Sequence, residues 1–194
     1  LETLSLTLPE NPYIYHVTAY GTTPGQSAYF FREAAEHRGI TVRAAFSVRT
    51  VDTWVPVFDL RDGEKNRRIT EQAALAAEHI ADDVFARLHG NFVGTVLPLP
   101  LAWGVYQNYR AARKTKYFSV DETLCIGCGL CASQCPDNAI AMKEGTPVFV
   151  AAECDLCLAC LHRCPKAAIR YKTKNRHGQF VNPCAFGKHP VTKA

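Results

Sequence analysis

The chain has 194 residues, of which 47% are hydrophobic and 21% charged, with a formal net charge of +4. This composition is typical of a globular protein, and the length leaves room for one domain of ordinary size or two small ones. No apolar run reaches the length of a membrane span, and no charged-then-apolar signal segment stands at the start. We therefore expect a cytoplasmic protein with no membrane span.

Residues 13–51 predict a strand, a helix and a second strand. The run 13–20 is β-branched and aromatic, which favours a buried strand, and it ends in the glycine-rich loop 21–25. A helix follows, with Gly39 as its C-terminal cap, and residues 41–51 read as the next strand. A strand–helix–strand unit of this length implies a parallel sheet.

The middle of the chain predicts a charged turn region over 59–68 and a helix from Thr70, its cap, to Leu88, with Gly90 ending it. Apolar residues repeat along this helix at three- and four-residue steps: Ala73, Ala77, Ile80, Val84, Phe85 and Leu88. We expect this stripe to cover the sheet.

Residues 93–116 are interrupted by prolines but are too apolar for a free tether, so we expect a linker that packs between two domains. A short helix is predicted over 106–113. Its aromatic residues are then interface or core groups: Trp103, Tyr106 and Tyr109.

Eight of the nine cysteines form two copies of one spacing, C-x₂-C-x₂-C-x₃-C-P. The copies run from Cys125 to Pro136 and from Cys154 to Pro165, 29 residues apart. Three thiolates on one tight loop can hold three corners of a cubane, while the fourth cysteine follows a short helical turn that directs it elsewhere. This pattern indicates iron–sulfur chemistry.

Other uses of the cysteines fit the pattern less well. A zinc site uses two spaced pairs of ligands, and a disulfide framework needs an oxidising compartment. Strand 117–120, short antiparallel pairs formed by 141–142, 147–150 and 169–171, and a turn at 143–146 complete the predicted module. We expect Ile126 and Leu156 to shield the metal centres from water.

The cysteine run resembles that of bacterial two-cluster ferredoxins, in which the fourth cysteine ligates the other cluster. The resemblance implies two [4Fe–4S] clusters with crossed ligands. Cluster I takes Cys125, Cys128, Cys131 and Cys164, and cluster II takes Cys154, Cys157, Cys160 and Cys135. Cys184 is left over and is interpreted as a plain thiol.

The segment before the cysteines resembles the C-terminal half of a flavodoxin-like domain, and the whole chain is similar to the EFR-type family, which fuses such a domain to a ferredoxin. Residues 15–25, 47–56 and 176–183 carry this resemblance. It implies a flavin near Tyr20, Gly21, Thr22 and Trp54, because ligands of such folds bind at the carboxyl ends of the strands. Ordinary rim or core roles are equally open for Tyr20 and Trp54.

The phosphate-binding loop that starts a flavodoxin-like domain is missing before Tyr13. Three explanations are open: the chain is a fragment, its sheet is completed elsewhere, or the flavin site has been lost. We therefore do not expect FMN to bind tightly to this chain alone.

Bound clusters change the charge balance. Eight thiolates and two oxidised cores bring the total from +4 to roughly zero, so the basic composition does not indicate nucleic-acid binding. The expected partners are redox proteins, and the oligomeric state stays open. The basic segment 166–174 is either a docking patch or a solvated face.

The predicted fold class is α+β and α/β: a partial flavodoxin-like α/β domain (1–92), a linker (93–116), a two-[4Fe–4S] ferredoxin domain (117–174) and a tail (175–194). The predicted function is transfer of single electrons between redox partners. The alternatives are a flavin-dependent oxidoreductase fed by the clusters, and an iron–sulfur sensor or scaffold. Whether the protein is an enzyme is left open, because no activated nucleophile or acid–base pair stands out.

Overall fold

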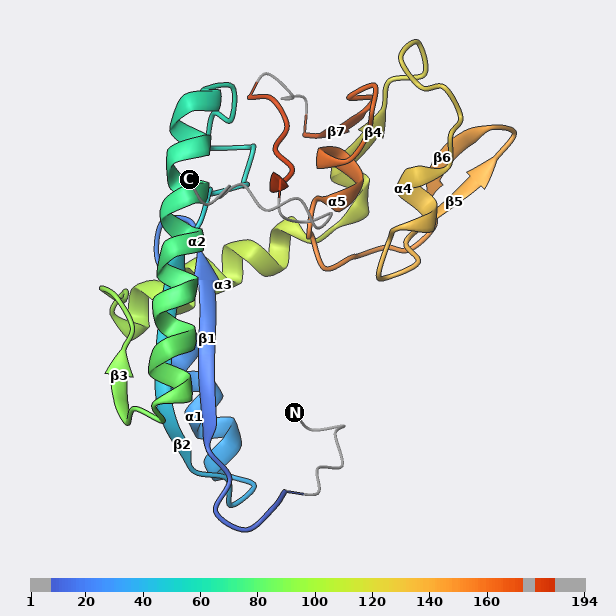
Figure 1. Ribbon diagram of the computed structural model, residues 1–194. Helices are drawn as coiled ribbons and strands as arrows, with labels where there is room; N and C mark the ends of the chain where they lie inside the picture. Colours follow the sequence, from blue (N-terminus) through green and yellow to red (C-terminus); the bar gives the residue numbers. More distant parts are fainter. Residues whose placement is uncertain (1–7, 173–176, 184–194) are drawn as a thin grey trace. The chain divides into compact units, whose positions relative to one another are not determined.

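The computed structural model describes residues 8–172 and 177–183, which form two compact units (Figure 1). The first unit contains residues 8–52 and 67–103, and the second contains 53–66 together with the described residues from 104 onward. This grouping cuts across the predicted domain boundaries, because 53–66 belongs with the cysteine-rich part. Cys184 lies outside the described residues.

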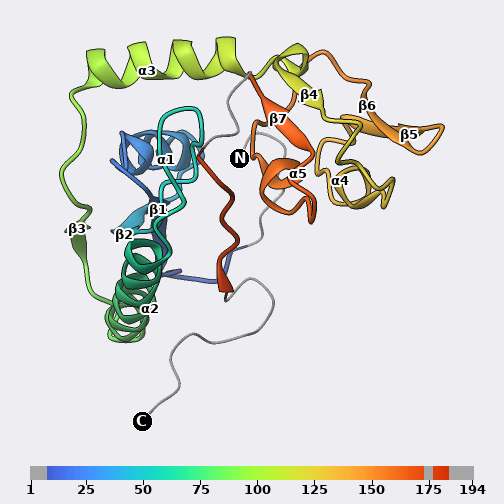
Figure 2. The same cartoon turned by 90° about the horizontal axis from the view of Figure 1, so that it is seen from above.

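A three-stranded parallel sheet in the order β1-β2-β3 forms the first unit. Its elements are β1 (Ile14–Tyr20), α1 (Ser27–Glu36), β2 (Val42–Arg49) and β3 (Gly90–Phe92). In Figure 2, α1 lies on one face of the sheet and α2 (Gly63–Phe85), which enters this unit at residue 67, lies on the other. The predicted strand–helix–strand unit is confirmed, whereas the flavodoxin-like assignment stays a prediction.

The central strand β2 supplies the core of this unit, and Ala44, Ala45 and Phe46 are at most 1% exposed. The edge strand β1 is not buried as expected. Its side chains alternate between half-buried and exposed, with Tyr15 42% and Val17 45% exposed, so one face of this edge strand is less covered than the other.

The predicted cap of α1 is confirmed. Gly39 has a φ of 69°, a left-handed conformation that glycine adopts without cost. Its N–H donates to the Glu36 carbonyl at 2.9 Å, and the Ile40 N–H donates to the Ala35 carbonyl at 3.0 Å. These two bonds satisfy the last carbonyls of the helix.

The long helix α2 begins at Gly63, so the predictions of a turn region up to residue 68 and of a cap at Thr70 were wrong. Asp62 is the cap, because its Oδ1 accepts the Lys65 N–H at 2.9 Å. Thr70 lies inside the helix and is buried, as are Asn66 and Ala73.

The end of α2 also differs from the prediction. The left-handed residue after the helix is Arg87, with φ 52°, while Gly90 opens β3. The Leu88 N–H donates to the Asp83 carbonyl at 3.0 Å, the bond that a left-handed cap makes. The apolar stripe was partly wrong, because Phe85 is 87% exposed and Ala77 is also exposed.

The predicted linker is mostly helix α3 (Leu99–Ala112). Its prolines lie at the first turn, where a missing N–H costs no hydrogen bond, and the Ala102 N–H donates to the Pro98 carbonyl at 3.0 Å. The aromatic residues expected to be interface or core groups are exposed: Trp103 (66%), Tyr106 (56%) and Tyr109 (41%). No helix in the described part of the chain is long and apolar enough to cross a membrane.

The cysteine-rich module has two halves related by the same 29-residue shift as the motifs. It contains a short 3₁₀ turn (Thr115–Tyr117), β4 (Phe118–Val120), α4 (Leu130–Ser133), β5 (Ile140–Lys143), β6 (Thr146–Phe149), α5 (Ala159–His162) and β7 (Ile169–Tyr171). Strands β4 and β7 pair antiparallel, as do β5 and β6, which confirms the predicted small pairs. The registers match: Ile140 faces Phe149, and their equivalents Ile169 and Val120 face each other.

Candidate functional site

The two cysteine loops have the same backbone path. Three positions in each copy adopt left-handed conformations, and each lies 29 residues from its counterpart. The paired φ values are 68° and 53° at Gly127 and Leu156, 72° and 57° at Gly129 and Leu158, and 50° and 51° at Asn138 and Ala167. The first copy mostly uses residues that tolerate this conformation, whereas the second holds leucine and alanine there.

The side chains explain this difference. A Cβ at Gly127 would stand 2.8 Å from the Gly145 carbonyl oxygen, so no larger residue fits the first loop. Leu156 and Leu158 are 5% and 3% exposed, and burial of their side chains offsets the conformational cost. Ile126 lines site I but is 61% exposed, so it shields that site only in part, whereas Leu156 is buried without lining either space.

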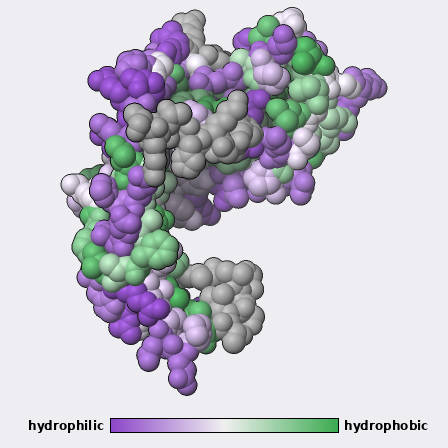
Figure 3. Space-filling model, in the orientation of Figure 1, coloured by the Kyte–Doolittle hydropathy of each residue, from purple (hydrophilic) through white to green (hydrophobic). Residues whose placement is uncertain are grey.

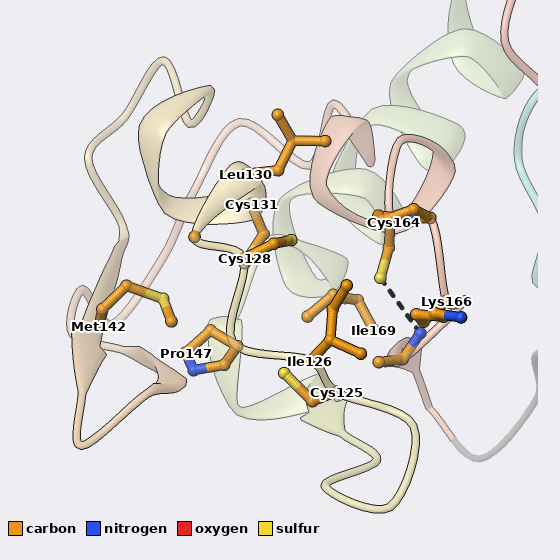
Figure 4. A pocket seen from close by; sticks show the side chains of 13 residues that line it. Cys125, Ile126, Cys128, Leu130, Cys131, Met142, Pro147, Cys164, Lys166 and Ile169 are labelled. Atoms are coloured by element: carbon orange, nitrogen blue, oxygen red, sulfur yellow. Dashed lines mark hydrogen bonds between the residues drawn. The ribbon is translucent and has the colours of Figure 1, made fainter.

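Each loop, together with one cysteine of the other copy, lines a separate space, and Figure 4 shows the first of the two. The two spaces, site I and site II, enclose about 360 Å³ and 330 Å³, counting the part open to solvent. Site I is lined by Cys125, Cys128, Cys131 and Cys164, and site II by Cys135, Cys154, Cys157 and Cys160. Figure 4 shows the sulfur atoms of Cys125, Cys128 and Cys164 turned toward the space between them.

Helices α4 and α5 are the reason for this exchange. Each carries the third cysteine of its motif, and the fourth follows directly after the helix, on the side of the other site. The thiols of Cys135 and Cys164 each accept a backbone N–H at 3.3 Å, from Ala139 and Ala168. Such bonds orient a thiolate and stabilise its negative charge.

Burial makes several of these thiols hard to ionise while they carry no metal. Desolvation raises the pKa of Cys160 to about 12 and also raises the pKa values of Cys131 and Cys154. The thiols of Cys164 and Cys135 add to the shifts at Cys131 and Cys154, respectively, so the crossing cysteines act on the opposite motif. A bound cation overcomes this cost, because a coordinating thiol loses its proton outright.

The donor set fits an iron–sulfur cluster better than a single metal ion. All eight described cysteines are free thiols, a soft donor type suited to iron–sulfur clusters. In the described ranges, no three His, Cys, Asp or Glu side chains converge closely enough to hold one ion. A cluster needs no such convergence, because each thiolate binds a different iron.

The residues predicted to lie near a flavin fall in different units. Tyr20, Gly21 and Thr22 stand at the carboxyl end of β1 in the first unit, where Thr22 Oγ1 donates to Asp52 Oδ2 at 2.7 Å. A Cβ at Gly21 would lie 2.3 Å from the Asp52 Cβ, so the loop is closely packed. Trp54 lies in the second unit against Tyr171, with 5.5 Å between the ring centroids.

Two segments that the sequence did not connect with the cysteines lie around α5. The His162 ring is 8% exposed, with Nε2 at 3.0 Å from the Thr53 carbonyl and Nδ1 accepting the Phe180 N–H at 3.3 Å. Gln179 donates to the carbonyls of Leu161 and Cys164. No local pattern near residues 53 or 180 announces these contacts, since they depend on the tertiary fold.

Apolar side chains are also exposed around the sites. Figure 3 shows them on the face of the second unit around α4, β5 and β6. Leu124 is 42% and Val148 37% exposed, and Ile126, which lines site I, is 61% exposed. An apolar rim of this kind is suited to contact with another protein.

Comparison with known proteins points to iron–sulfur cluster binding. The family described as 4Fe-4S binding domain matches residues 118–141. Over 53 residues the chain is 45% identical to a ferredoxin of Thermococcus litoralis, covering 26% of this chain and 90% of that protein. Over 40 residues it is 48% identical to NADH-quinone oxidoreductase subunit I 1 of Koribacter versatilis (strain Ellin345), covering 21% of this chain. The chain spans about a quarter (26%) of the length of that subunit.

Proposed function

Because the chain belongs to the ferredoxin family through its cysteine-rich module, we propose that it holds two [4Fe–4S] clusters and passes single electrons between redox partner proteins. The observation that carries this proposal is the division of the eight cysteines. Each site takes three from one motif and the fourth from the other. We propose these two sets as the ligands of cluster I and cluster II.

A [4Fe–4S] cluster, when bound, supplies a one-electron couple. The chain supplies four thiolates at each site, a buried wall that excludes water and N–H groups that stabilise sulfur charge. The buried wall includes Leu158 at site II and Ile169 at site I. Because α4 packs against α5, the two sites are neighbours across this pair of helices. Such proximity suits transfer from one site to the other.

The electron-carrier proposal is tested by repeated redox cycling. Anaerobically purified protein is reduced with dithionite and reoxidised several times while its iron content and visible absorbance are followed. We expect full recovery of the absorbance with no loss of iron, because four thiolates at each site hold the cluster and the crossing thiolates of Cys135 and Cys164 also accept backbone N–H bonds. Loss of iron on the first reduction would contradict a carrier and favour the alternative of a sensor that responds by losing its cluster.

A flavin-dependent oxidoreductase is the second candidate, favoured by the closely packed Gly21–Thr22 loop at the carboxyl end of a parallel strand. On this proposal Tyr20, Gly21 and Thr22 of the first unit contact the flavin, and the clusters feed it. On the electron-carrier proposal, the chain retains no stoichiometric FMN after incubation and desalting. Retained FMN at one per chain would favour the oxidoreductase over the carrier.

A further inference from the structure

The two cluster sites differ in charge at one equivalent position. The residue after each Cys-Pro pair is Asp137 in the first copy and Lys166 in the second, 29 residues apart. The cysteine exchange places Lys166 at site I and Asp137 at site II. Among the described residues that line each site, Lys166 is the one charged side chain at site I, and Asp137 at site II.

Two ion pairs lie close to the motifs. Beside the first motif, Arg170 is paired with Asp121, whose carbonyl accepts the Cys125 N–H. Beside the second motif, Arg113 is paired with Asp155 at 2.8 Å. Each pair adds little net charge to its site. Arg163, which is hydrogen-bonded to the neutral Gln134, lines neither site. The lining residues themselves therefore differ in charge through Lys166 and Asp137.

The position of Asp137 is fixed by the backbone. Its carboxylate accepts the N–H of Asp155, the residue that follows the first cysteine of the second motif. The side chain is half-buried, which reduces screening by water. Lys166 is exposed, so its charge is screened more strongly.

We propose that Lys166 and Asp137 make the two sites unequal, so that a single added electron resides at site I. This inference rests on the proposed function, in which both sites hold a [4Fe–4S] cluster. Reduction adds one negative charge, which the Lys166 ammonium stabilises and the Asp137 carboxylate opposes. Site I therefore has the higher reduction potential, and site II is the donor within the module.

The transfer is a one-electron step. An electron from a low-potential iron–sulfur or flavin donor protein enters the module, and passage from site II to site I oxidises site II by one electron and reduces site I by one. No bond is made or broken, and no proton is required. The charge difference makes this passage favourable and the reverse passage unfavourable.

The test measures the potential of each site in three variants, Lys166→Met, Asp137→Asn and the double exchange Lys166→Asp with Asp137→Lys. Met keeps the apolar stem of lysine, and Asn keeps the acceptor for the Asp155 N–H. Lys116→Met is the matched control, because Lys116 is exposed in the same module and lines neither site. EPR-monitored titration gives the potentials, and paramagnetic NMR of the cysteine β-protons assigns each potential to a site.

In the native protein, we expect the signals of the site I cysteines to change first on partial reduction. Asp137→Asn should lower the preference of the electron for site I over site II about tenfold, which is 59 mV for a one-electron couple. Lys166→Met should lower this preference by less, because the exposed ammonium is screened more strongly. The double exchange should reverse the order, and the control should leave the preference unchanged.

Two sites that titrate together, or an order that the double exchange leaves unchanged, would overturn the inference while the proposed function stands. Purified protein with far fewer than about eight iron atoms per chain would overturn the proposed function and the inference with it.

Discussion

Gln134 and Arg163 occupy equivalent positions in the two cysteine motifs and are hydrogen-bonded to each other, with Arg163 Nη1 donating to Gln134 Oε1 at 2.8 Å. Two equivalent residues can touch only where the axis that relates the copies passes between them. That axis therefore runs between α4 and α5, which carry these residues at their ends. The arrangement explains why each fourth cysteine reaches the site of the other copy.

The close approach of the first loop to the turn between β5 and β6 predicts unequal effects at two glycines. Both Gly127→Ala and Gly129→Ala place a side chain at a left-handed φ, costing about 1–2 kcal/mol. Gly127→Ala also drives a Cβ to 2.8 Å from a backbone oxygen, whereas the nearest atom at Gly129 is 3.9 Å away. In anaerobic denaturant unfolding of the holoprotein, we expect Gly127→Ala to lose more stability than its partner variant. Equal losses would show that this approach does not constrain the loop.

The left-handed conformation of Leu158 predicts that glycine is more stabilising than alanine at this position, the reverse of the usual order in a helix. Both Leu158→Ala and Leu158→Gly lose a buried side chain, at about 2–5 kcal/mol. Glycine also removes the strain at φ 57°, so the glycine variant should be more stable by about 1 kcal/mol. Leu161, which is 1% exposed and lies within α5, is the control, and there the alanine variant should be the more stable. The same order at both positions would contradict the role of strain.

The cysteine spacing predicted the iron–sulfur module, and the short apolar segments between the motifs predicted its strand pairs and the turn, where Glu144 and Gly145 have positive φ. The signal was strong because it depends on local chain geometry repeated twice. The sequence did not reveal that Thr53 and Trp54 belong to the same unit, because those contacts form between segments more than 100 residues apart. Both ends of α2 were also predicted wrongly, because its caps are Asp62 at the start and the left-handed Arg87 at the end, and neither residue was the expected one.

The exchange of ligands between the motifs predicts how much iron each pair of cysteine substitutions leaves in the protein. Cys125→Ser with Cys164→Ser removes two ligands of site I, so the protein should retain about four iron atoms. Cys154→Ser with Cys164→Ser damages both sites and should retain almost none. Cys184→Ser is the control and should keep the full content. Retention by the second pair and loss in the first would refute the crossed assignment.

The half-buried ring of His16 predicts that the stability of the first unit depends on pH. Desolvation, with a further contribution from Arg32, lowers its pKa below the ordinary value of 6.5, and its Nδ1 has no hydrogen-bond partner among the described residues. The unfolded chain therefore binds the proton more tightly than the folded chain. Stability falls as the pH drops from the pKa of His16 in the unfolded chain through its lower pKa in the folded chain. NMR titration should show a pKa below 6.5 for His16, and His16→Phe should flatten the pH dependence of unfolding. A measured pKa above 6.5 would disprove this explanation.

The central claim is that the eight motif cysteines hold two [4Fe–4S] clusters. Anaerobic purification followed by iron and sulfide analysis, with EPR of the dithionite-reduced protein, tests it most directly. We predict about eight iron and eight sulfide per chain and two mutually interacting signals, because the two sites are neighbours across α4 and α5. Stoichiometric zinc without iron, or a single non-interacting signal at about four iron per chain, would contradict the claim.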